Sequence, residues 1–504
     1  LMEAESCGHT FMHPHERLRS TEDAINSITV EEVNGVAQEL CEHLSHIDPA
    51  EGVRPAAIIA CAPMLDRNGV EFCVTEEDIL GAMKEALAKS DDIQPLEETE
   101  VPDTLLTKEQ LQAKAAACKP AFVPLGGKGA AAGNNNKNRM GVVQKQCSNG
   151  VKVNLFSMND EPQKAGIRMY VPGGRMRESP DSPGSVLTGS RTIQEGGAFL
   201  EMTREEVELF CIDHLVMVDI VATEDALIFD FQTVTTPGPG GKVTGLEACM
   251  QVIHIIMTDF KYETDAFERA RQGFHEHYDS VVKGLESCCQ EKLTESLLSG
   301  DPRFVTPNHQ AIDALDLPTS KKAITEQLDP RNVEVSIAGD APMSYLENLA
   351  LTYLGTIPPR EDTTAGLSGN LQGSLEISTL GGSKQLDVFL QDSDERAMGY
   401  LAGPCPNRWG VFADGSTVAD ALSKLNFGKI DDRRKHPMFG LVLLSVLQEV
   451  ANRRLFSVVR EERRLTYDAS FHFNGPETLQ GSWYTVSVTS SPAQVQEALV
   501  ACKE

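Results

Sequence analysis

The sequence predicts an α+β protein in which one arrangement of strands and helices occurs twice. Two observations carry this prediction. Segments that alternate between apolar and polar residues, as half-buried strands do, lie next to segments with the 3.6-residue apolar period of helices. The order strand, strand, helix, strand begins near residue 148 and begins again near residue 384, after a Gly/Ser/Thr-rich stretch at 360–383. This repetition indicates a duplicated α+β unit.

The first repeat opens at the turn dipeptide Asn149-Gly150. Alternating apolar residues predict strands at 151–158 and 165–171, a strand–turn–strand at 217–234, and a strand at 333–339. Helical periodicity predicts helices within 184–197, 203–216, 246–299 and 344–355. Thr203 followed by Glu206 forms a capping box, which strengthens the second of these helix predictions.

The second repeat contains a long helix that turns into a strand. Strands are predicted at 385–392 and 397–403, and the helix starts near Pro437. Its predicted buried face is made of apolar residues near the helical period, namely Leu443, Leu447, Val450, Leu455 and Val459. A charged run from Arg460 to Arg464 ends that pattern, and strand-like alternation follows up to Phe473. Arg460 and Tyr467 bracket the predicted turn.

Composition narrows the classes of function. The 504 residues are 41% hydrophobic and 24% charged, which is ordinary for a globular protein, and the net charge is −29. Such a charge would repel a phosphate backbone, so we expect no nucleic-acid partner, although it is compatible with basic peptides. We expect no membrane span, because no run of 18 apolar residues occurs.

Both ends of the chain look cut, so we expect it to be part of a longer protein. Helical patterns over 21–47 and an apolar run at 55–62 resemble the close of a domain. We therefore predict the following division: the end of a truncated domain at 1–74, a linker at 75–147, a domain at 148–359, a second linker at 360–383 and a further domain, truncated at its end, at 384–504.

The histidines do not predict a metal site. His275 and His277 lie about 200° apart around a helix, so they do not share one metal. His43 and His46 are better spaced but belong to an acidic helix, where exposed surface histidines are expected. His9, His13 and His15 lie in an irregular stretch containing proline.

A glycine pair and two arginines follow the predicted strand at 165–171. Gly173-Gly174 are expected to end a strand where positive φ is needed. The neighbouring Arg175 and Arg177 form either a basic patch that meets an acidic surface or a pair of solvated side chains.

The start of the first repeat resembles the pitrilysin/insulinase family of zinc peptidases, through NGVKVNLF, AGIRMYVPGGRMRES and PGSVLTGSRTIQEGG. An active domain of that family carries P-G-x-x-H-x-x-E-H on its helix. Pro183-Gly184 match, but Leu187 and Arg191 stand at the two zinc-ligand positions and Ser190 stands at the position of the base glutamate. Leucine has no donor atom, arginine stays protonated and serine is no general base, so this domain is predicted to be inactive and to hold no metal.

The resemblance extends over most of residues 20–504, through runs such as MTREEVELFCIDHLV, GDPRFVTP, DSDERAMGYLAGPCPNRWG and WYTVSVTSSP. It implies repeated domains, each with a mixed or antiparallel sheet flanked by helices and joined by a long linker. It also implies a zinc metalloendopeptidase as the full-length protein. The zinc would be held by an N-terminal catalytic half that is not in this chain, so this chain alone is expected to be inactive.

The family members that this chain resembles most remove transit peptides from proteins imported into plastids. The resemblance therefore implies precursor proteins with basic transit peptides as substrates, and the chloroplast stroma as the location. The rival interpretation is a family member without catalysis, acting as a scaffold or a presequence-binding subunit.

In this family an Arg-x6-Tyr pair of the fourth domain binds the substrate backbone and stabilises charge on the attacked carbonyl. Arg460 and Tyr467 have that spacing. The resemblance thus implies a catalytic role for both residues. The alternative is an arginine that interacts favourably with a helix C-terminus and a tyrosine packed in a strand.

Overall fold

The computed structural model describes two units of the chain separately, Leu1–Glu98 and Thr99–Glu504. The described residues are 8, 12–45, 59–61, 71, 73–89, 99–125, 141–196, 199, 202–238, 242–298, 300–301, 304–359, 385–390, 394–407, 438–466, 468–474 and 482–504. None of the helices formed by these residues has both the length and the apolar character needed to cross a membrane.

The first unit contains helices α2 (Pro14–Ser27), α3 (Val30–Ser45) and α4 (Glu76–Ala88). Thr29 caps α3, because its hydroxyl accepts the Glu32 N–H at 3.2 Å and its own N–H donates to the Glu32 carboxylate at 2.9 Å. Residues 59–61, the described part of the predicted apolar strand, are exposed and form no strand.

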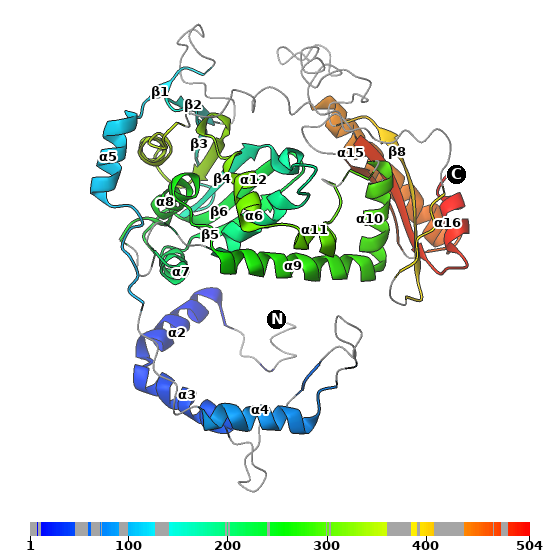
Figure 1. Ribbon diagram of the computed structural model, residues 1–504, viewed down its shortest axis with the longest axis horizontal. Coiled ribbons are helices and arrows are strands. Elements are labelled where there is room, and N and C mark those ends of the chain that lie inside the picture. Colours follow the sequence, from blue (N-terminus) through cyan, green and yellow to red (C-terminus); the bar gives the residue numbers. More distant parts are fainter. Residues whose placement is uncertain are drawn as a thin grey trace. The chain divides into compact units, whose positions relative to one another are not determined.

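The second unit is built on a mixed sheet, seen in Figure 1. Among the described residues seven strands follow the order β1-β2-β3-β7-β4-β6-β5. Their bounds are β1 Phe122–Val123, β2 Val143–Cys147, β3 Lys152–Ser157, β4 Lys164–Pro172, β5 Met217–Ala222, β6 Ala226–Val234 and β7 Glu334–Gly339. Neighbouring strands are antiparallel except β3 and β7, which run parallel. The mixed α+β fold predicted from the sequence is confirmed.

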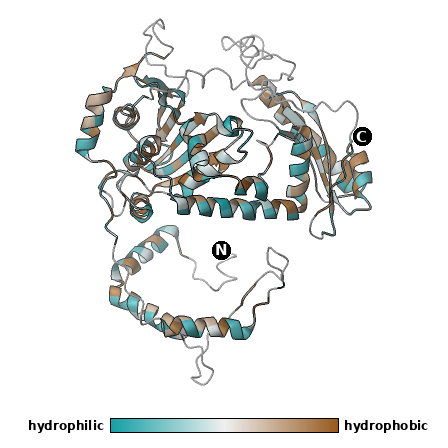
Figure 2. Cartoon of the chain, in the orientation of Figure 1, coloured by the Kyte–Doolittle hydropathy of each residue, from teal (hydrophilic) through white to brown (hydrophobic). Residues whose placement is uncertain are grey.

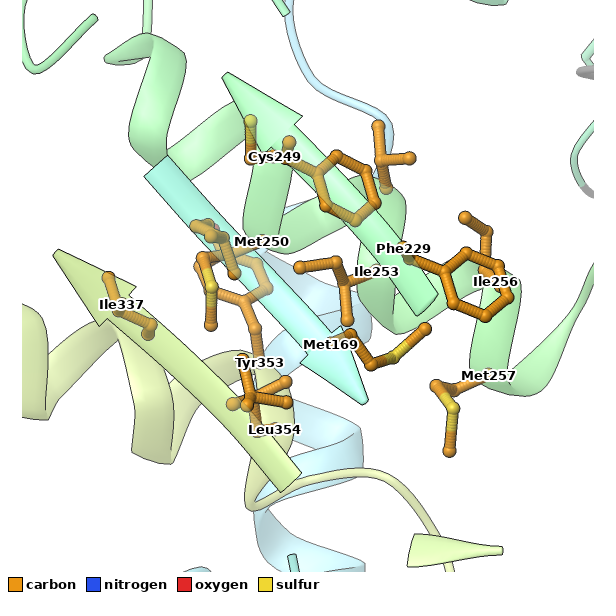
Figure 3. Packing of buried hydrophobic residues seen from close by; sticks show 14 of the residues in the cluster. Met169, Phe229, Cys249, Met250, Ile253, Ile256, Met257, Ile337, Tyr353 and Leu354 are labelled. Atoms are coloured by element: carbon orange, nitrogen blue, oxygen red, sulfur yellow. The ribbon is translucent and has the colours of Figure 1, made fainter. Parts of the chain in front are cut away.

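Helices pack against this sheet and against one another. Their bounds are α5 Lys108–Cys118, α6 Ser185–Gly196, α7 Arg204–Asp213, α8 Gly245–Thr258, α9 Thr264–Lys283, α10 Leu285–Leu297, α11 His309–Asp313, α12 Leu317–Thr325 and α13 Met343–Leu349, with short turns η3 Gly174–Arg177 and η4 Pro330–Asn332 and a π-helix η5 at Ala350–Leu354. Figure 3 shows the core between one sheet face, α8 and η5, where Met169, Phe229, Ile253 and Tyr353 meet. These four side chains are at most 2% exposed.

Part of the predicted linker at 75–147 belongs to the fold. It contains α4, α5, β1 and β2, and Leu105 and Leu106 are each only 2% exposed. The backbone N–H groups of these two leucines donate to the buried Gln251 side-chain oxygen at 2.8 and 3.1 Å. The low-complexity stretch of that linker at 126–140 and the linker at 360–383 lie outside the described residues. The domain boundaries as a whole therefore stay a prediction.

A second, smaller sheet has the order β8-β10-β9, and both of its strand pairs are antiparallel. Its elements are β8 Ala397–Cys405, α15 Phe439–Leu455, the π-helix η7 Phe456–Glu462, β9 Asp468–Asn474, β10 Ser482–Ser490 and α16 Val495–Ala501. Trp483 of this sheet packs with Leu297 and Leu298 of the first part in one buried cluster. The two sheets are thus joined through α10.

The two sheets repeat one arrangement. In the first, β4 is followed by α6 and α7, then β5, β6 and α8, and the strands lie in the order β4-β6-β5. In the second, β8 is followed by α15, then β9, β10 and α16, and the strands lie in the order β8-β10-β9. The predicted repetition is therefore present from the second strand of each repeat onward, and α15 is the counterpart of α6.

Two predictions for the second repeat are wrong. The expected strand at 385–392 is absent from its described residues, 385–390, which are mostly exposed. The expected buried face of the long helix is buried only at Leu455 and Val459, whereas Leu443, Leu447 and Val450 are 51–57% exposed. The physical reason is the same in both cases. In the first repeat α9 and α12 pack on α6, and β7 pairs with β3. No described element covers the exposed side of α15 or pairs with residues 385–390 in this way.

A buried histidine in α8 makes the stability of the fold depend on pH. His254 is fully buried, with its Nδ1 2.6 Å from the Tyr353 carbonyl oxygen in η5. Burial lowers the pKa of His254 to about 4 from its ordinary value of 6.5. Between these pH values the unfolded chain binds a proton that the folded chain does not bind. Stability contributed by neutral His254 is therefore complete above pH 6.5 and is lost as the pH falls towards 4.

We expect the variant His254→Asn, which keeps an N–H donor for Tyr353, to lose less stability than the wild type as the pH falls. The loss is measured as the change in unfolding free energy from urea titrations at several pH values between 4 and 7.5. The wild type should lose roughly 3 kcal/mol more than the variant across that window. Parallel pH profiles for the two proteins would contradict the assignment.

Candidate functional site

The helix that corresponds to the zinc-binding helix of the resembled family is α6, and a buried carboxylate positions its start. Glu178 is 5% exposed, and its carboxylate accepts the Gly184 N–H at 2.9 Å and the Val186 N–H at 3.0 Å. These amides have no partner within the helix, so the carboxylate satisfies them and favours the helix dipole. Burial raises the pKa of Glu178, and the Arg175 guanidinium and the helix amides oppose that rise.

Arg175 is the cationic partner of this carboxylate. It is 7% exposed, its Nε lies 3.9 Å from Glu178, and its guanidinium donates to the Val305 carbonyl at 2.8 Å. The expected basic patch, whether solvated or facing another acidic surface, is therefore wrong for Arg175. A buried guanidinium needs the compensation that Glu178 and Val305 supply.

Glycines allow the chain to reach this arrangement. Gly173 and Gly174 have φ values of +146° and +58°, as expected for the strand end. A Cβ atom on Gly174 would lie 2.4 Å from both the Ala226 nitrogen and the Thr223 oxygen. The turn between β4 and α6 thus depends on close backbone approach.

The positions of the lost zinc ligands form the outer side of α6. Leu187 and Arg191 are one helical turn apart, and they are half-buried and exposed, respectively. The Arg191 guanidinium lies 2.7 Å from the Glu195 carboxylate. Ser190 is 5% exposed and its hydroxyl donates to the Leu187 carbonyl at 2.9 Å.

These residues do not fit a zinc ion. Leu187 offers no lone pair, Arg191 is a cation paired with Glu195, and the Ser190 hydroxyl is occupied by the helix backbone. Elsewhere in the described part of the chain no group of three or more His, Cys, Asp or Glu side chains is arranged to hold a metal. His9 and His46 lie outside the described residues.

The structure pairs His275 with His309 rather than with His277. The two Nδ1 atoms are 2.7 Å apart, and the Nε2 atoms lie 3.1 Å from Asp313 and 2.8 Å from Asp279, respectively. This chain of hydrogen bonds ties α9 to α11. Sequence reasoning missed it because the partners are 34 residues apart.

The second candidate site is the turn between α15 and β9. Arg460 lies on the π-helix η7, is exposed, and has its guanidinium carbon 4.8 Å from the Phe456 ring centroid. Val459 and Leu465, buried to 1% and 7% exposure, anchor the two ends of the turn. A π-helix is rare and is often found at functional sites. The sequence patterns did not predict one here.

Tyr467 lies outside the described residues, so its distance from Arg460 stays untested. Its neighbours are held in place, since the Thr466 hydroxyl donates to the Asp468 carbonyl at 2.8 Å and accepts the Asp468 N–H at 3.0 Å. The proposed role of the pair therefore remains a prediction.

The larger sheet also carries a polar face and a cavity that sequence reasoning did not identify. On the side of β4 away from the core, Arg168 makes a bidentate pair with Asp230 at 2.6 and 2.7 Å. A cavity of about 930 Å³ opens beside the edge strand β5, where Ile212 and Met217 are 65% and 63% exposed.

Comparison with known proteins decides the family. Residues 319–504 match the domain described as "Peptidase M16 inactive domain". The whole chain is 34% identical over 528 residues to "Stromal processing peptidase, chloroplastic" of Arabidopsis thaliana. The chain belongs to the M16 peptidase family. This confirms the pitrilysin/insulinase resemblance.

The relatives are longer than this M16 chain. The Arabidopsis thaliana protein and the protein of the same name from Pisum sativum are each 34% identical to it over its entire length, and the chain spans 41% of each of them.

Solved structures share the fold. The periplasmic protease PqqL from Escherichia coli matches the whole chain with a TM-score of 0.59 and 13% identity, and the match covers 47% of PqqL. The ferredoxin protease FusC, crystallised as a point mutant in complex with Arabidopsis ferredoxin, matches with a TM-score of 0.54 and 14% identity, over 100% of this chain and 47% of that one.

We expect Glu178→Ala to destabilise the second unit, because it leaves Arg175 buried without its carboxylate and leaves the Gly184 and Val186 N–H groups buried without an acceptor. The loss should be roughly 3 kcal/mol, as for a broken buried ion pair, measured by denaturant unfolding. Glu205→Ala on the exposed side of α7 is the matched control and should change stability by less than about 0.5 kcal/mol. Equal effects of the two variants would contradict the structural role of Glu178.

Proposed function

We propose that this chain is the non-catalytic C-terminal half of a zinc metalloendopeptidase that removes transit peptides in the chloroplast stroma. Together with the N-terminal catalytic half it encloses a chamber around the substrate, and it binds the extended peptide. The observation that carries the proposal is the 34% identity to chloroplastic stromal processing peptidases over 100% of this chain. The zinc belongs to an N-terminal catalytic half of the same protein.

The side chains of α6 support the assignment of zinc to the catalytic half. Its outer side presents Leu187 and Arg191 where ligands would stand, and Arg191 is already paired with Glu195. Because this helix cannot coordinate a metal, the contribution of the chain is to bind and orient the peptide.

The net charge supports a basic substrate. With a charge of −29, the chain attracts segments rich in Lys and Arg, and transit peptides are poor in acidic residues. Long-range attraction of this kind raises the rate of encounter and falls with ionic strength.

Arg460 and Tyr467 are the proposed contacts with the reacting peptide group. The exposed Arg460 side chain supplies a permanent cation, and Tyr467 supplies a phenol donor. Donors directed at the oxygen of an attacked carbonyl stabilise the negative charge that develops there. The Arg460 side chain is exposed, with its guanidinium carbon 4.8 Å from the Phe456 ring centroid.

We expect Tyr467→Phe and Arg460→Ala each to reduce kcat for a precursor substrate in the full-length protein by roughly 100-fold, as for a lost oxyanion donor. Arg454→Ala, which removes an exposed arginine from α15, is the matched control and should leave kcat unchanged. Turnover unchanged by both test variants would remove the pair from the mechanism.

The rival function is a catalytically inactive scaffold or presequence-binding subunit. The two are separated by the sequence upstream of Leu1 in the full-length protein. H-x-x-E-H followed by a further helical glutamate supports the peptidase, and their absence supports the scaffold.

A further inference from the structure

The cavity beside β5 includes a low row of residues on the side of the larger sheet that faces away from its core. Four residues that line the cavity stand opposite one another across four strands, namely Ala338 on β7, Gly166 on β4, Gln232 on β6 and Met217 on β5. Residues paired in this way share one face of a sheet. Gly166 has no side chain and Ala338 has only a methyl group, so the surface is low at these two strands. This part of the cavity is called here the open-face hollow.

Apolar side chains border the hollow. Met158, Ile212 and Leu215 line the same cavity as Met217, and the last three are 65%, 46% and 63% exposed, respectively. Ile212 belongs to α7, whose mixture of apolar and polar residues is seen in Figure 2. The volume of about 930 Å³ lies within the range of about 300–1,000 Å³ that is usual for ligand pockets. The hollow therefore has room for a large apolar side chain.

A charged row runs beside the hollow. Arg168, Asp230 and Asp219 stand opposite one another on β4, β6 and β5, two residues along each strand from the row that contains Gly166. The Arg168 guanidinium donates to both oxygens of Asp230 at 2.6 and 2.7 Å. Asp219 is exposed and lies directly across from Asp230. Two carboxylates in such positions repel each other, so a second cation beside Asp219 would be stabilised there.

The other charged residues at the hollow already form a pair. The Lys164 ammonium lies 3.1 Å from the Glu161 carboxylate, and both residues line the cavity. This pair and the pair of Arg168 with Asp230 are each neutral. Asp219 therefore adds a negative charge that neither pair cancels, and this charge favours a ligand with a cationic group.

The spacing of the two rows matches that of an extended peptide. The rows are two strand residues apart, which is about 6.7 Å. Side chains i and i+2 of an extended peptide lie on one side of it at the same spacing. We propose that the open-face hollow and Asp219 form a specificity subsite for the substrate peptide, with an apolar side chain in the hollow and a Lys or Arg two positions away at Asp219. The inference rests on the proposed function, because it names the kind of peptide segment that this chain selects.

Binding of short synthetic peptides to the 504-residue chain tests the subsite separately from cleavage. The first peptide carries Leu-Ser-Arg within a sequence of Ser, Thr and Gly. In the second peptide Glu replaces the Arg, and in the third Ser replaces the Leu. Fluorescence anisotropy at low ionic strength should show that the first binds roughly fivefold more tightly than the second and roughly tenfold more tightly than the third.

The variant Gly166→Val tests the hollow. A Cβ atom on Gly166 would lie 3.7 Å from the Phe231 carbonyl oxygen, which is an ordinary contact distance, so valine fills the hollow without displacing β4. The variant should abolish the preference for Leu over Ser. Gln144→Val lies on the same face of the sheet but three strands from β4, and as the matched control it should keep that preference.

The variant Asp219→Asn tests the charged position. It should abolish the preference for Arg over Glu, because it removes the carboxylate that meets the basic side chain. Glu205→Gln removes the same charge from an exposed position on α7. As the matched control it should keep the preference, which separates a local contact from the net charge of the chain.

Three outcomes overturn the subsite. The first is equal affinity of the wild type for the three peptides, and the second is a preference that changes as much in the controls as in the test variants. The third is a dimer in sedimentation velocity that Ile212→Asp dissociates, which would assign the hollow to a second copy. Precursor cleavage by the full-length protein is measured in parallel. Cleavage with equal peptide affinities would contradict the subsite alone, whereas selective binding without cleavage would contradict the proposed function alone.

Discussion

The larger sheet depends on one long-range strand. β7 lies between β3 and β4, although it follows them in the sequence by more than 160 residues, and it pairs in parallel with the first and antiparallel with the second. Val335 and Ile337 place its apolar side chains in the core with at most 1% exposure. Without β7, the strands β3 and β4 on its two sides would not belong to one sheet. The core on which α8 and η5 pack would then lose one of its surfaces.

The same constraint explains what could and could not be predicted from the sequence. Local signals succeeded, because the Thr203–Glu206 capping box, the alternation in β4 and the positive φ at Gly173 depend on residues near one another. Predictions that depended on distant partners failed. The apolar period of α15 indicates a stripe but not what covers it, and the strand pattern at 385–390 indicates a propensity but not a partner.

The candidate site shows the same limit. Leu187, Ser190 and Arg191 could be assigned as non-ligands from their chemistry alone, and their positions on α6 agree with that assignment. The buried Arg175 could not be foreseen, because its carboxylate and carbonyl partners, Glu178 and Val305, are recognised only when the turn and a distant segment meet. In this M16 chain the start of α6 is therefore stabilised by Glu178, whereas the outer side of α6 has no side chains suited to bind a metal.

The central claim is that this chain binds and orients a peptide but supplies neither metal nor hydrolysis. The most direct test measures zinc content and precursor cleavage together on the purified 504-residue chain after dialysis against zinc. The account predicts far less than one equivalent of zinc and no cleavage. One tightly bound equivalent of zinc together with cleavage of the precursor would contradict it.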